Sequence, residues 1–354
     1  MAPIIGHEVA RRVLRSLAAG GDPPHALMLA GPARTGRTLL ALELAALLNC
    51  EAEPDDRACG ECRACRLIAD GVHPDVLRLE PGDSFCRGEG GHERHPRSRD
   101  IRICQVRGLI ESVSRYPFEG RYRVIVLEPA DRIGLEAANT LLKTLEEPPP
   151  HTVLVLVTAA PEALLETIRS RCRALEVGLV PRETIAEGLR ALDFAPEIAA
   201  RAAAESRRRP ADAIAFAEHP DLMDDRGRLL DRCAELAAGR AAERMTYAGD
   251  LADRWRRDRE LVLTELDAWE TFWETRLRED VAEPAAGAQD ALTALQAIGA
   301  ARDDLEAQVV ARMALELMLL RFPGVRLAEP TAVGPSANGH RASVPAAPKD
   351  ESES

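Results

Sequence analysis

The stretch that most restricts the fold of this chain is Gly31-Pro-Ala-Arg-Thr-Gly-Arg-Thr38. It matches the phosphate-binding pattern G-x-x-x-x-G-K-[ST] at every fixed position except the lysine, which is replaced by Arg37. The apolar run Ala26–Ala30 precedes it and the helical stretch Leu39–Leu48 follows it. A phosphate-binding loop requires this strand–loop–helix order, so the sequence predicts an α/β nucleotide-binding domain. Arginine carries a planar, forked guanidinium, whereas lysine carries a compact ammonium charge, so the replacement alters the chemistry of the loop.

The rest of residues 1–178 predicts a parallel sheet with helices around it. Continuous runs of valine, leucine and isoleucine are typical of strands that are buried on both faces. In Ile133–Leu145 the apolar residues recur at helical spacing, and Pro148 ends that helix. The candidate strands are Ala26–Ala30, Val76–Leu79, Arg123–Leu127, Thr152–Thr158 and Arg173–Val177.

The strand signal ends near residue 178, and the remaining chain predicts helices. Residues 179–240 give short amphipathic helices separated by prolines, and residues 241–325 give longer helices that carry all three tryptophans. We expect loops at Gly82–Arg99 and at Val281–Asp290, and a disordered tail over residues 326–354, which are rich in proline, serine, glycine and alanine.

Composition and the N-terminal sequence argue against three classes of protein. The chain has no run of about 18 uncharged apolar residues, so we expect no membrane-spanning helix. The N-terminus does not read as a signal peptide, and a cytoplasmic location is the expectation. The net charge of −12 disfavours a protein that grips DNA by itself, because such proteins are usually basic.

Four of the eight cysteines are closely spaced in the sequence: Cys50, Cys59, Cys62 and Cys65. Two C-x2-C steps and a fourth thiolate can close a tetrahedron, which suits a structural Zn²⁺ site. An iron–sulfur cluster would usually take its fourth ligand downstream, before a proline, whereas Arg66 follows Cys65. Free thiols in a reducing compartment are the other alternative.

A second metal site from Cys86, His92 and His95 is a weaker hypothesis, since all three lie in the segment that we interpret as a surface loop.

An active ATPase with such a loop needs acidic residues after a second apolar strand, to order Mg²⁺ and, in many cases, to polarise the attacking water. Here Arg123–Leu127 runs into Glu128-Pro-Ala-Asp131. Glu128 occupies the metal position, and Pro129, which cannot accept a proton, occupies the water-activating position. Together with Arg37, Pro129 predicts the loss of hydrolysis.

Nucleotide binding without hydrolysis is the alternative to a complete loss of function at the loop, because Gly31, Gly36 and Thr38 are retained. The residues that would contact the nucleotide are those of the altered loop and the altered acidic motif: Gly31, Gly36, Arg37, Thr38, Glu128 and Asp131.

Ser170-Arg171-Cys172 is a further candidate site. An exposed arginine at the rim of such a domain can enter a neighbour's site and stabilise charge on the γ-phosphate. Spacing alone does not distinguish Arg171 from an ordinary surface arginine.

These motifs resemble the clamp-loader subunits of bacterial DNA polymerase III, a family within the AAA+ superfamily. The resemblance covers about residues 4–325. It is carried by the altered loop and by Leu48-Asn-Cys50, Gly71-Val-His-Pro-Asp75, Ala138-Asn-Thr-Leu-Leu-Lys-Thr-Leu-Glu-Glu-Pro-Pro149, Ser170-Arg-Cys172 and Ala311–Arg321.

The resemblance implies an AAA+ domain over residues 1–178 with a zinc module at about 50–65, a three-helix lid over 179–240 and a helical collar over 241–325 that assembles the loader. It implies that Arg171, flanked by Ser170 and Cys172, reaches the ATP site of an adjacent subunit. The implied partners are the gamma or tau ATPase subunits and the delta subunit and, through the assembly, the sliding clamp and primed DNA. The chain would then belong to a DNA polymerase holoenzyme without catalysis of its own.

Two kinds of clamp-loader subunit carry the zinc module, the delta-prime kind and the gamma or tau ATPase. The ATPase keeps the loop lysine and an Asp-Glu pair, and it has an arginine before a lid step that corresponds here to Asp212-Ala-Ile214, preceded by Ala211. The departures favour the delta-prime kind. An active gamma/tau-like ATPase, with Arg37 in the role of lysine, is the alternative, and a zinc-containing AAA+ adaptor outside replication is a third.

Overall fold

A computed structural model describes residues 3–21, 23–82, 85–86, 95, 98–113, 116–280, 286–306 and 309–323. The chain divides into two compact units, with the boundary between Asp224 and Asp225. Most of the loop expected at Gly82–Arg99 and the whole tail expected at 326–354 lie outside the described residues.

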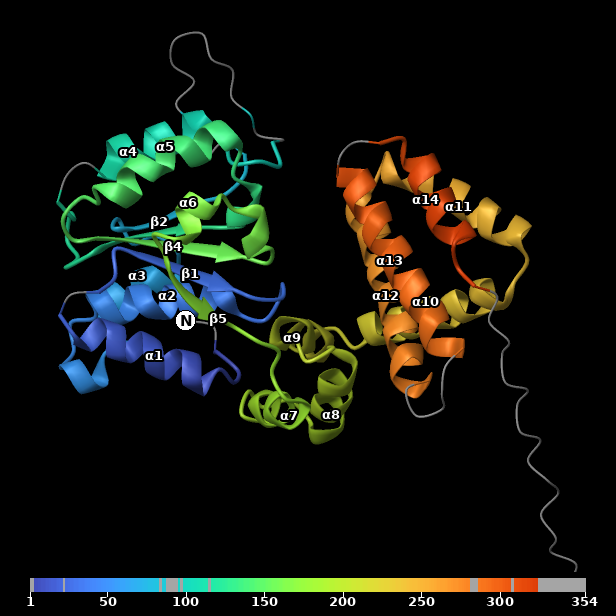
Figure 1. The fold of residues 1–354 in the computed structure, drawn as a ribbon. Helices are drawn as coiled ribbons and strands as arrows, with labels where there is room; N and C mark the ends of the chain where they lie inside the picture. The colour runs from blue at the N-terminus through green and yellow to red at the C-terminus, as the bar shows by residue number, and fades with distance from the viewer. Residues whose placement is uncertain are drawn as a thin grey trace, which may run out of the picture. The chain divides into compact units, whose positions relative to one another are not determined.

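The first unit is built on a five-stranded parallel sheet with the strand order β2-β3-β4-β1-β5 (Figure 1). Every residue of β1, β3 and β4 is buried, as the apolar runs predict for strands covered on both faces. The predicted parallel sheet is confirmed, and the strands are β1 (Ala26–Ala30), β2 (Val76–Leu79), β3 (Arg123–Leu127), β4 (Thr152–Thr158) and β5 (Arg173–Glu176).

Helices cover both faces of this sheet (Figure 1). Side chains of α1 (Glu8–Ala19), α2 (Arg37–Asn49) and α3 (Arg63–Ala69) share one core with alternate residues of the strands. Side chains of α4 (Ile103–Val113), α5 (Leu135–Glu146) and α6 (Glu166–Arg169) share a second core with the other face. The result is an α/β fold in which the parallel sheet lies between two layers of helices.

Three short helices complete the first unit: α7 (Arg182–Arg190), α8 (Pro196–Glu205) and α9 (Pro210–Glu218). Proline occupies the first helical position of α8 and α9, where its missing N–H costs no hydrogen bond. These helices surround a small core of their own, which Ile5 from the start of the chain joins.

The described part of the second unit is helical: α10 (Asp221–Ala238), α11 (Ala241–Trp255), α12 (Arg259–Asp280), α13 (Ala286–Glu306) and α14 (Ala311–Leu320). α10 begins just before the unit boundary. Trp269 and Trp273 are fully buried, with ring centroids 4.9 and 5.5 Å from that of Phe322. None of the helices in the described residues combines the length and the apolar character that a membrane crossing requires.

Two expected boundaries are wrong. α5 begins at Leu135 and not at Ile133, because Ile133 is extended and forms a bridge with Ile101. Residues 286–290, expected in a loop, form the first turns of α13. This segment is rich in alanine, a strong helix former, and the buried side chains of Ala291 and Ala294 hold the helix on the core.

Candidate functional site

The altered phosphate-binding loop connects the end of β1 to the start of α2. Gly31 has a φ of 150°, and a Cβ atom there would come within 2.0 Å of the Val177 carbonyl oxygen, so only glycine fits. Gly36 precedes α2 with a φ of 100°, a conformation that side chains rarely adopt. The loop is also held by the N-terminal segment, since the Thr35 carbonyl accepts a hydrogen bond from His7 Nε2 at 2.8 Å. The fold therefore retains the shape of a phosphate-binding loop.

Arg37 lies buried in the first turn of α2, with 8% of its surface exposed. Its Nη1 has no hydrogen-bond partner among the described residues. Burial lowers the pKa of Arg37, whereas the charges of Glu128 and Asp131 act in the opposite direction. The guanidinium thus lies inside the protein beside two acids. A phosphate-binding lysine, in contrast, would need to be accessible to the nucleotide.

The two groups that would serve Mg²⁺ in an ATPase are bonded to each other. Thr38 Oγ1 donates a hydrogen bond to Glu128 Oε1 at 2.5 Å, whereas the loop hydroxyl and the strand-end acid of an active site both contact the metal ion. Asp131 accepts hydrogen bonds from Thr158 Oγ1 at 2.7 Å and from the Ala159 N–H at 3.1 Å. Both acids are therefore tied to protein groups.

The loop is also tied to α9. The Arg34 side chain forms an ion pair with Asp212, and the Ala211 N–H donates to the Arg34 carbonyl at 3.2 Å. Sequence reasoning identified Asp212 only as part of a lid step and missed this pair. Two charged residues so far apart in the chain give no local signal of their contact.

The structure brings together the four cysteines that the sequence proposes as metal ligands. All four Sγ atoms lie within 4.8 Å of one another, with Cys50 Sγ 3.6 Å from Cys59 Sγ and 3.8 Å from Cys62 Sγ. Four thiolates around Zn²⁺ at about 2.3 Å would lie about 3.8 Å apart in a tetrahedron. The cluster of Cys50, Cys59, Cys62 and Cys65 therefore fits a tetrahedral metal ion.

Backbone N–H groups prepare this cluster for a metal. The N–H groups of Cys62 and Glu61 donate to Cys59 Sγ at 3.3 and 3.4 Å. These bonds lower the pKa of Cys59 to about 7, which favours the thiolate that metals bind. Gly60 makes the turn possible with a φ of 78°.

The weaker second metal site stays a prediction, because His92 lies outside the described residues. Cys86 is buried and adjoins Cys104, whose pKa is raised by burial and then by the hydrogen bond to Cys86.

The segment Ser170–Cys172 follows α6. Arg171 Nη1 donates to the Thr167 carbonyl at 2.9 Å, and Nη2 donates to Glu146 Oε1 at 2.7 Å. Cys172 packs against the core under α5 and α6, and burial raises its pKa to about 11. Cys172 thus anchors the segment, while Arg171, with 37% of its side chain exposed, lies at the surface.

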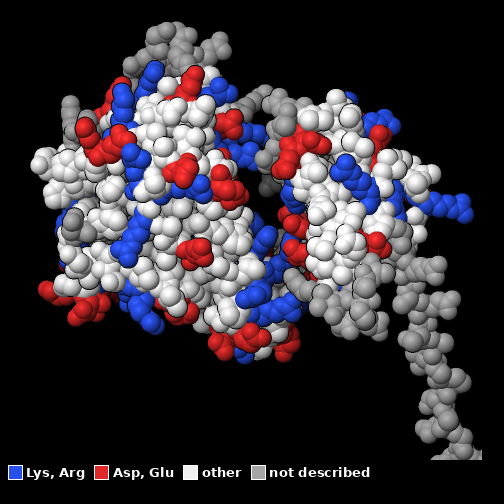
Figure 2. Space-filling model, in the orientation of Figure 1, with Lys and Arg blue, Asp and Glu red and all other residues white. Residues whose placement is uncertain are grey.

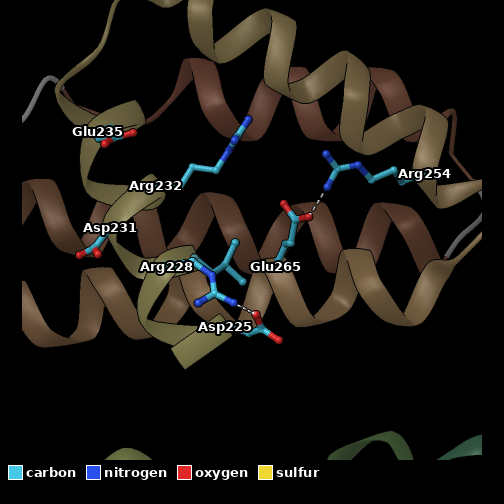
Figure 3. A pocket seen from close by; sticks show the side chains of 8 residues that line it. Asp225, Arg228, Asp231, Arg232, Glu235, Arg254 and Glu265 are labelled. Carbon is cyan, nitrogen blue, oxygen red and sulfur yellow. Dashed lines mark hydrogen bonds and ion pairs between the residues drawn. The ribbon is translucent and has the colours of Figure 1, made fainter. Parts of the chain in front are cut away.

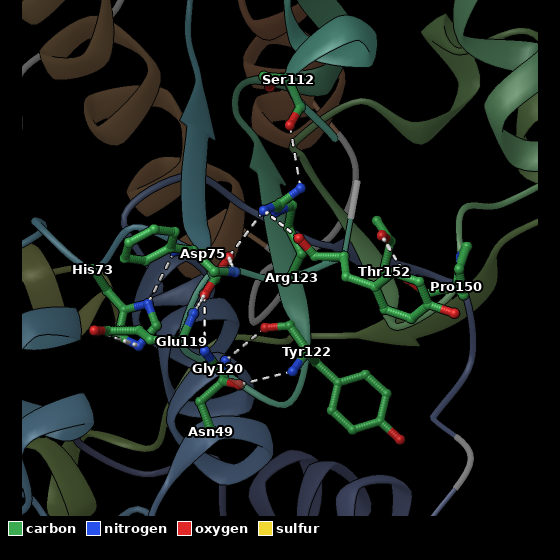
Figure 4. Close-up of polar contacts among 12 residues, drawn as sticks. Asn49, His73, Asp75, Ser112, Glu119, Gly120, Tyr122, Arg123, Pro150 and Thr152 are labelled. Carbon is green, nitrogen blue, oxygen red and sulfur yellow. Dashed lines mark hydrogen bonds and ion pairs between the residues drawn. The ribbon is translucent and has the colours of Figure 1, made fainter. Parts of the chain in front are cut away.

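A buried ionic network fixes the loop beside the metal module (Figure 4). Asp75, fully buried, accepts hydrogen bonds from the N–H groups of Phe118, Glu119 and Gly120 at 2.6, 2.8 and 2.8 Å. Its Oδ1 also accepts one from Arg123 Nη2 at 3.0 Å. Sequence reasoning missed this role, although an arginine at the head of a buried strand signals the need for a carboxylate partner.

We predict that Asp75→Asn destabilises the first unit by about 3 kcal/mol, because the buried Arg123 loses its carboxylate partner. Burial opposes ionisation of Asp75, but the three N–H bonds and Arg123 outweigh it and lower its pKa. The contribution of ionised Asp75 to the stability of the first unit is therefore fully present above a pH of about 4. It is lost as the pH falls through the lowered pKa of Asp75. Urea unfolding between pH 3 and 7 measures this, with exposed Asp55→Asn as the control. An equal loss of stability in both variants would contradict the role of Asp75.

The second unit holds a charged pocket of about 480 Å³ (Figure 3). Glu265 accepts a hydrogen bond from Arg254 Nη1 at 2.5 Å and another from the Tyr247 hydroxyl. Asp225 pairs with Arg228 in the same pocket. The pair of Glu265 with Arg254 joins α12 to α11, which is a structural role within the helical unit.

Acidic and basic side chains are interspersed over the face of the first unit that Figure 2 presents. A DNA-binding surface usually concentrates basic residues. This face therefore gives no indication of DNA binding by the first unit alone.

Comparison with known proteins gives matches to subunits of DNA polymerase III. Residues 6–180 match the profile of a family described as DNA polymerase III, delta subunit. Subunit delta' of DNA polymerase III from Pseudomonas aeruginosa is 43% identical over 148 residues, which are 42% of this chain and 41% of that protein. The Bacillus subtilis subunit delta' is 31% identical over 206 residues, 58% of this chain and 57% of that protein.

A second kind of relative also matches. Subunit tau of DNA polymerase III from Bacillus subtilis is 29% identical over 182 residues, which are 51% of this chain and 30% of that protein. The chain thus spans between 30% and 57% of the length of these three relatives.

Proposed function

We propose that the chain is a clamp-loader subunit of DNA polymerase III of the delta-prime kind, because residues 6–180 match the model of that polymerase's delta subunit family and because subunits delta' are among its relatives. It supports the loading of the sliding clamp on primed DNA during replication. It does not hydrolyse ATP itself, and it donates Arg171 to the ATP site of a neighbouring gamma or tau subunit. The delta subunit is a further partner.

The observation that carries this proposal is the burial of Arg37 beside Glu128 and Asp131. The Thr38 hydroxyl donates to Glu128 and keeps its lone pairs, so that hydrogen bond alone does not exclude a metal ion. The withdrawn Arg37 supplies no exposed positive charge for the phosphates, and Pro129 cannot activate water. Each of the three parts that an ATPase needs is altered.

The remaining parts of the chain take structural roles in this proposal. Zn²⁺ held by the four clustered thiols stabilises the module around α3. The helices α7, α8 and α9 form the lid, and the second unit forms the collar that assembles the loader.

A gamma/tau-like ATPase is the second candidate. The retained shape of the loop at Gly31 and Gly36 and the match to subunit tau favour it. In that case Arg37 would turn outward to meet the phosphates, and Glu128 would release Thr38 to bind the metal.

We predict that the purified chain turns over ATP only at the background rate, because the loop lacks an exposed cation and a base. Phosphate release with and without Mg²⁺ measures this, and the variant Thr38→Ala is the matched control. A rate well above background that Thr38→Ala abolishes would reject the non-hydrolysing assignment, whereas a rate that both proteins share comes from a contaminant. Binding of labelled ATP, with and without partner subunits, tests whether the loop still holds nucleotide.

A further inference from the structure

Glu146, the last residue of α5, holds the side chain of Arg171. Its Oε1 accepts a hydrogen bond from Arg171 Nη2 at 2.7 Å, and the Thr167 carbonyl accepts one from Nη1 at 2.9 Å. Two separate elements, α5 and α6, therefore fix the guanidinium. We propose that Glu146 is the positioning residue for Arg171, an inference that rests on the proposed function of Arg171 as an arginine finger in trans.

The base of the Arg171 side chain is fixed as well. The Arg171 N–H donates to the Ile168 carbonyl at 3.1 Å, and the Cys172 N–H donates to the Arg169 carbonyl at 3.1 Å. Ile168 is fully buried, and Cys172 packs against the same core. With the backbone fixed, the orientation of the guanidinium depends on the contacts at its tip. A side chain ordered before the neighbour docks loses less conformational freedom on docking.

The contacts at the tip leave donors for a phosphate. A guanidinium has five N–H groups, and the bonds to Thr167 and Glu146 each use one of them. Three remain, on a side chain that is 37% exposed. Arg171 can therefore stay bonded to Glu146 while it donates to an oxygen of the γ-phosphate.

The position of Glu146 also points to a role outside folding. A carboxylate in the last turn of a helix meets the negative end of the helix dipole. Exposed ion pairs contribute little to stability, and half of the Glu146 side chain, 51%, is exposed. The effect of the pair is thus expected in the orientation of Arg171 and not in the free energy of unfolding.

The test measures DNA-stimulated ATP hydrolysis by the reconstituted loader. The quantity compared is this part of the rate: the rate of the parent loader minus the rate of the Arg171→Ala loader. Glu146→Ala should lower the kcat of this part by about tenfold with KM for ATP unchanged, since a misplacement of about 1 Å can cost up to about 100-fold. Glu146→Gln keeps the acceptor Oε1 and should retain more than half of the rate. Glu147→Ala, the adjacent exposed glutamate, is the matched control and should leave the rate unchanged.

The double variant Glu146→Ala/Arg171→Ala separates a positioning role from an independent one. Because Glu146 acts through Arg171, the double variant should be no slower than Arg171→Ala alone. A normal or faster rate in Glu146→Ala, combined with a slow Arg171→Ala, would overturn the positioning role and leave the proposed function intact. Full hydrolysis in Arg171→Ala would overturn the proposed function, and the role of Glu146 with it.

Discussion

Replacing Arg171 by alanine should slow ATP hydrolysis at the neighbouring subunit's site by at least about 10³-fold, the lower end of what arginine fingers contribute in comparable enzymes. The reason is electrostatic: a guanidinium placed against the γ-phosphate stabilises charge that develops only in the transition state. The variant should fold and assemble normally, because Arg171 lies at the surface and Cys172 anchors the segment. First-turnover hydrolysis in the reconstituted, DNA-bound loader measures the effect.

Two controls sharpen this experiment. Arg169→Ala removes an exposed arginine two residues away and should leave hydrolysis unchanged. Arg171→Lys keeps the charge and loses the planar fork, so its rate should fall between those of the parent and of Arg171→Ala. The finger role is wrong if the Arg171→Ala loader keeps full DNA-stimulated hydrolysis and clamp loading.

Protein purified without added zinc should contain about one equivalent of Zn²⁺, and Cys62→Ser should lose it. The metal would cross-link the segment between α2 and α3, and structural zinc contributes roughly 10–16 kcal/mol in isolated zinc-finger peptides. We therefore expect the stretch from Cys50 to α3 to become sensitive to protease when the metal is lost. Metal analysis by mass spectrometry and limited proteolysis measure the two effects.

The matched control is Cys104→Ser, which changes a cysteine outside the cluster and should keep the zinc. A protein that holds iron and labile sulfide would point to the iron–sulfur alternative. A metal-free protein whose module resists protease would show that the thiols pack without a metal.

Local patterns were sufficient to predict the sheet. The apolar runs placed four strands at the residues where the structure has them, and the fifth ends one residue early, at Glu176. Patterns failed where a contact from elsewhere decides the outcome. Ile133 carries a helical pattern, but its bridge to Ile101 keeps it extended. The composition of residues 286–290 suggests a loop, but they begin the helix whose buried Ala291 and Ala294 pack on the helical core.

For the candidate site, residue types and spacing predicted which residues matter but not what they contact. The cysteine spacing indicated the cluster that the structure assembles. The pairs Arg34 with Asp212 and Arg171 with Glu146 could not be predicted, because a charge in a sequence of many charges does not reveal its partner. Such pairs depend on the tertiary placement of whole elements.

Gly31 gives a physical reason why a phosphate-loop motif can persist without its reaction. A side chain at this position would strike the Val177 carbonyl whether or not a nucleotide is present. Folding alone therefore forbids its replacement, while Gly36, with open space around it, is constrained only by its φ. A search by motif would count Gly31 as evidence of an ATPase. Here the glycine is required by the close contact between the end of β1 and the segment that follows β5.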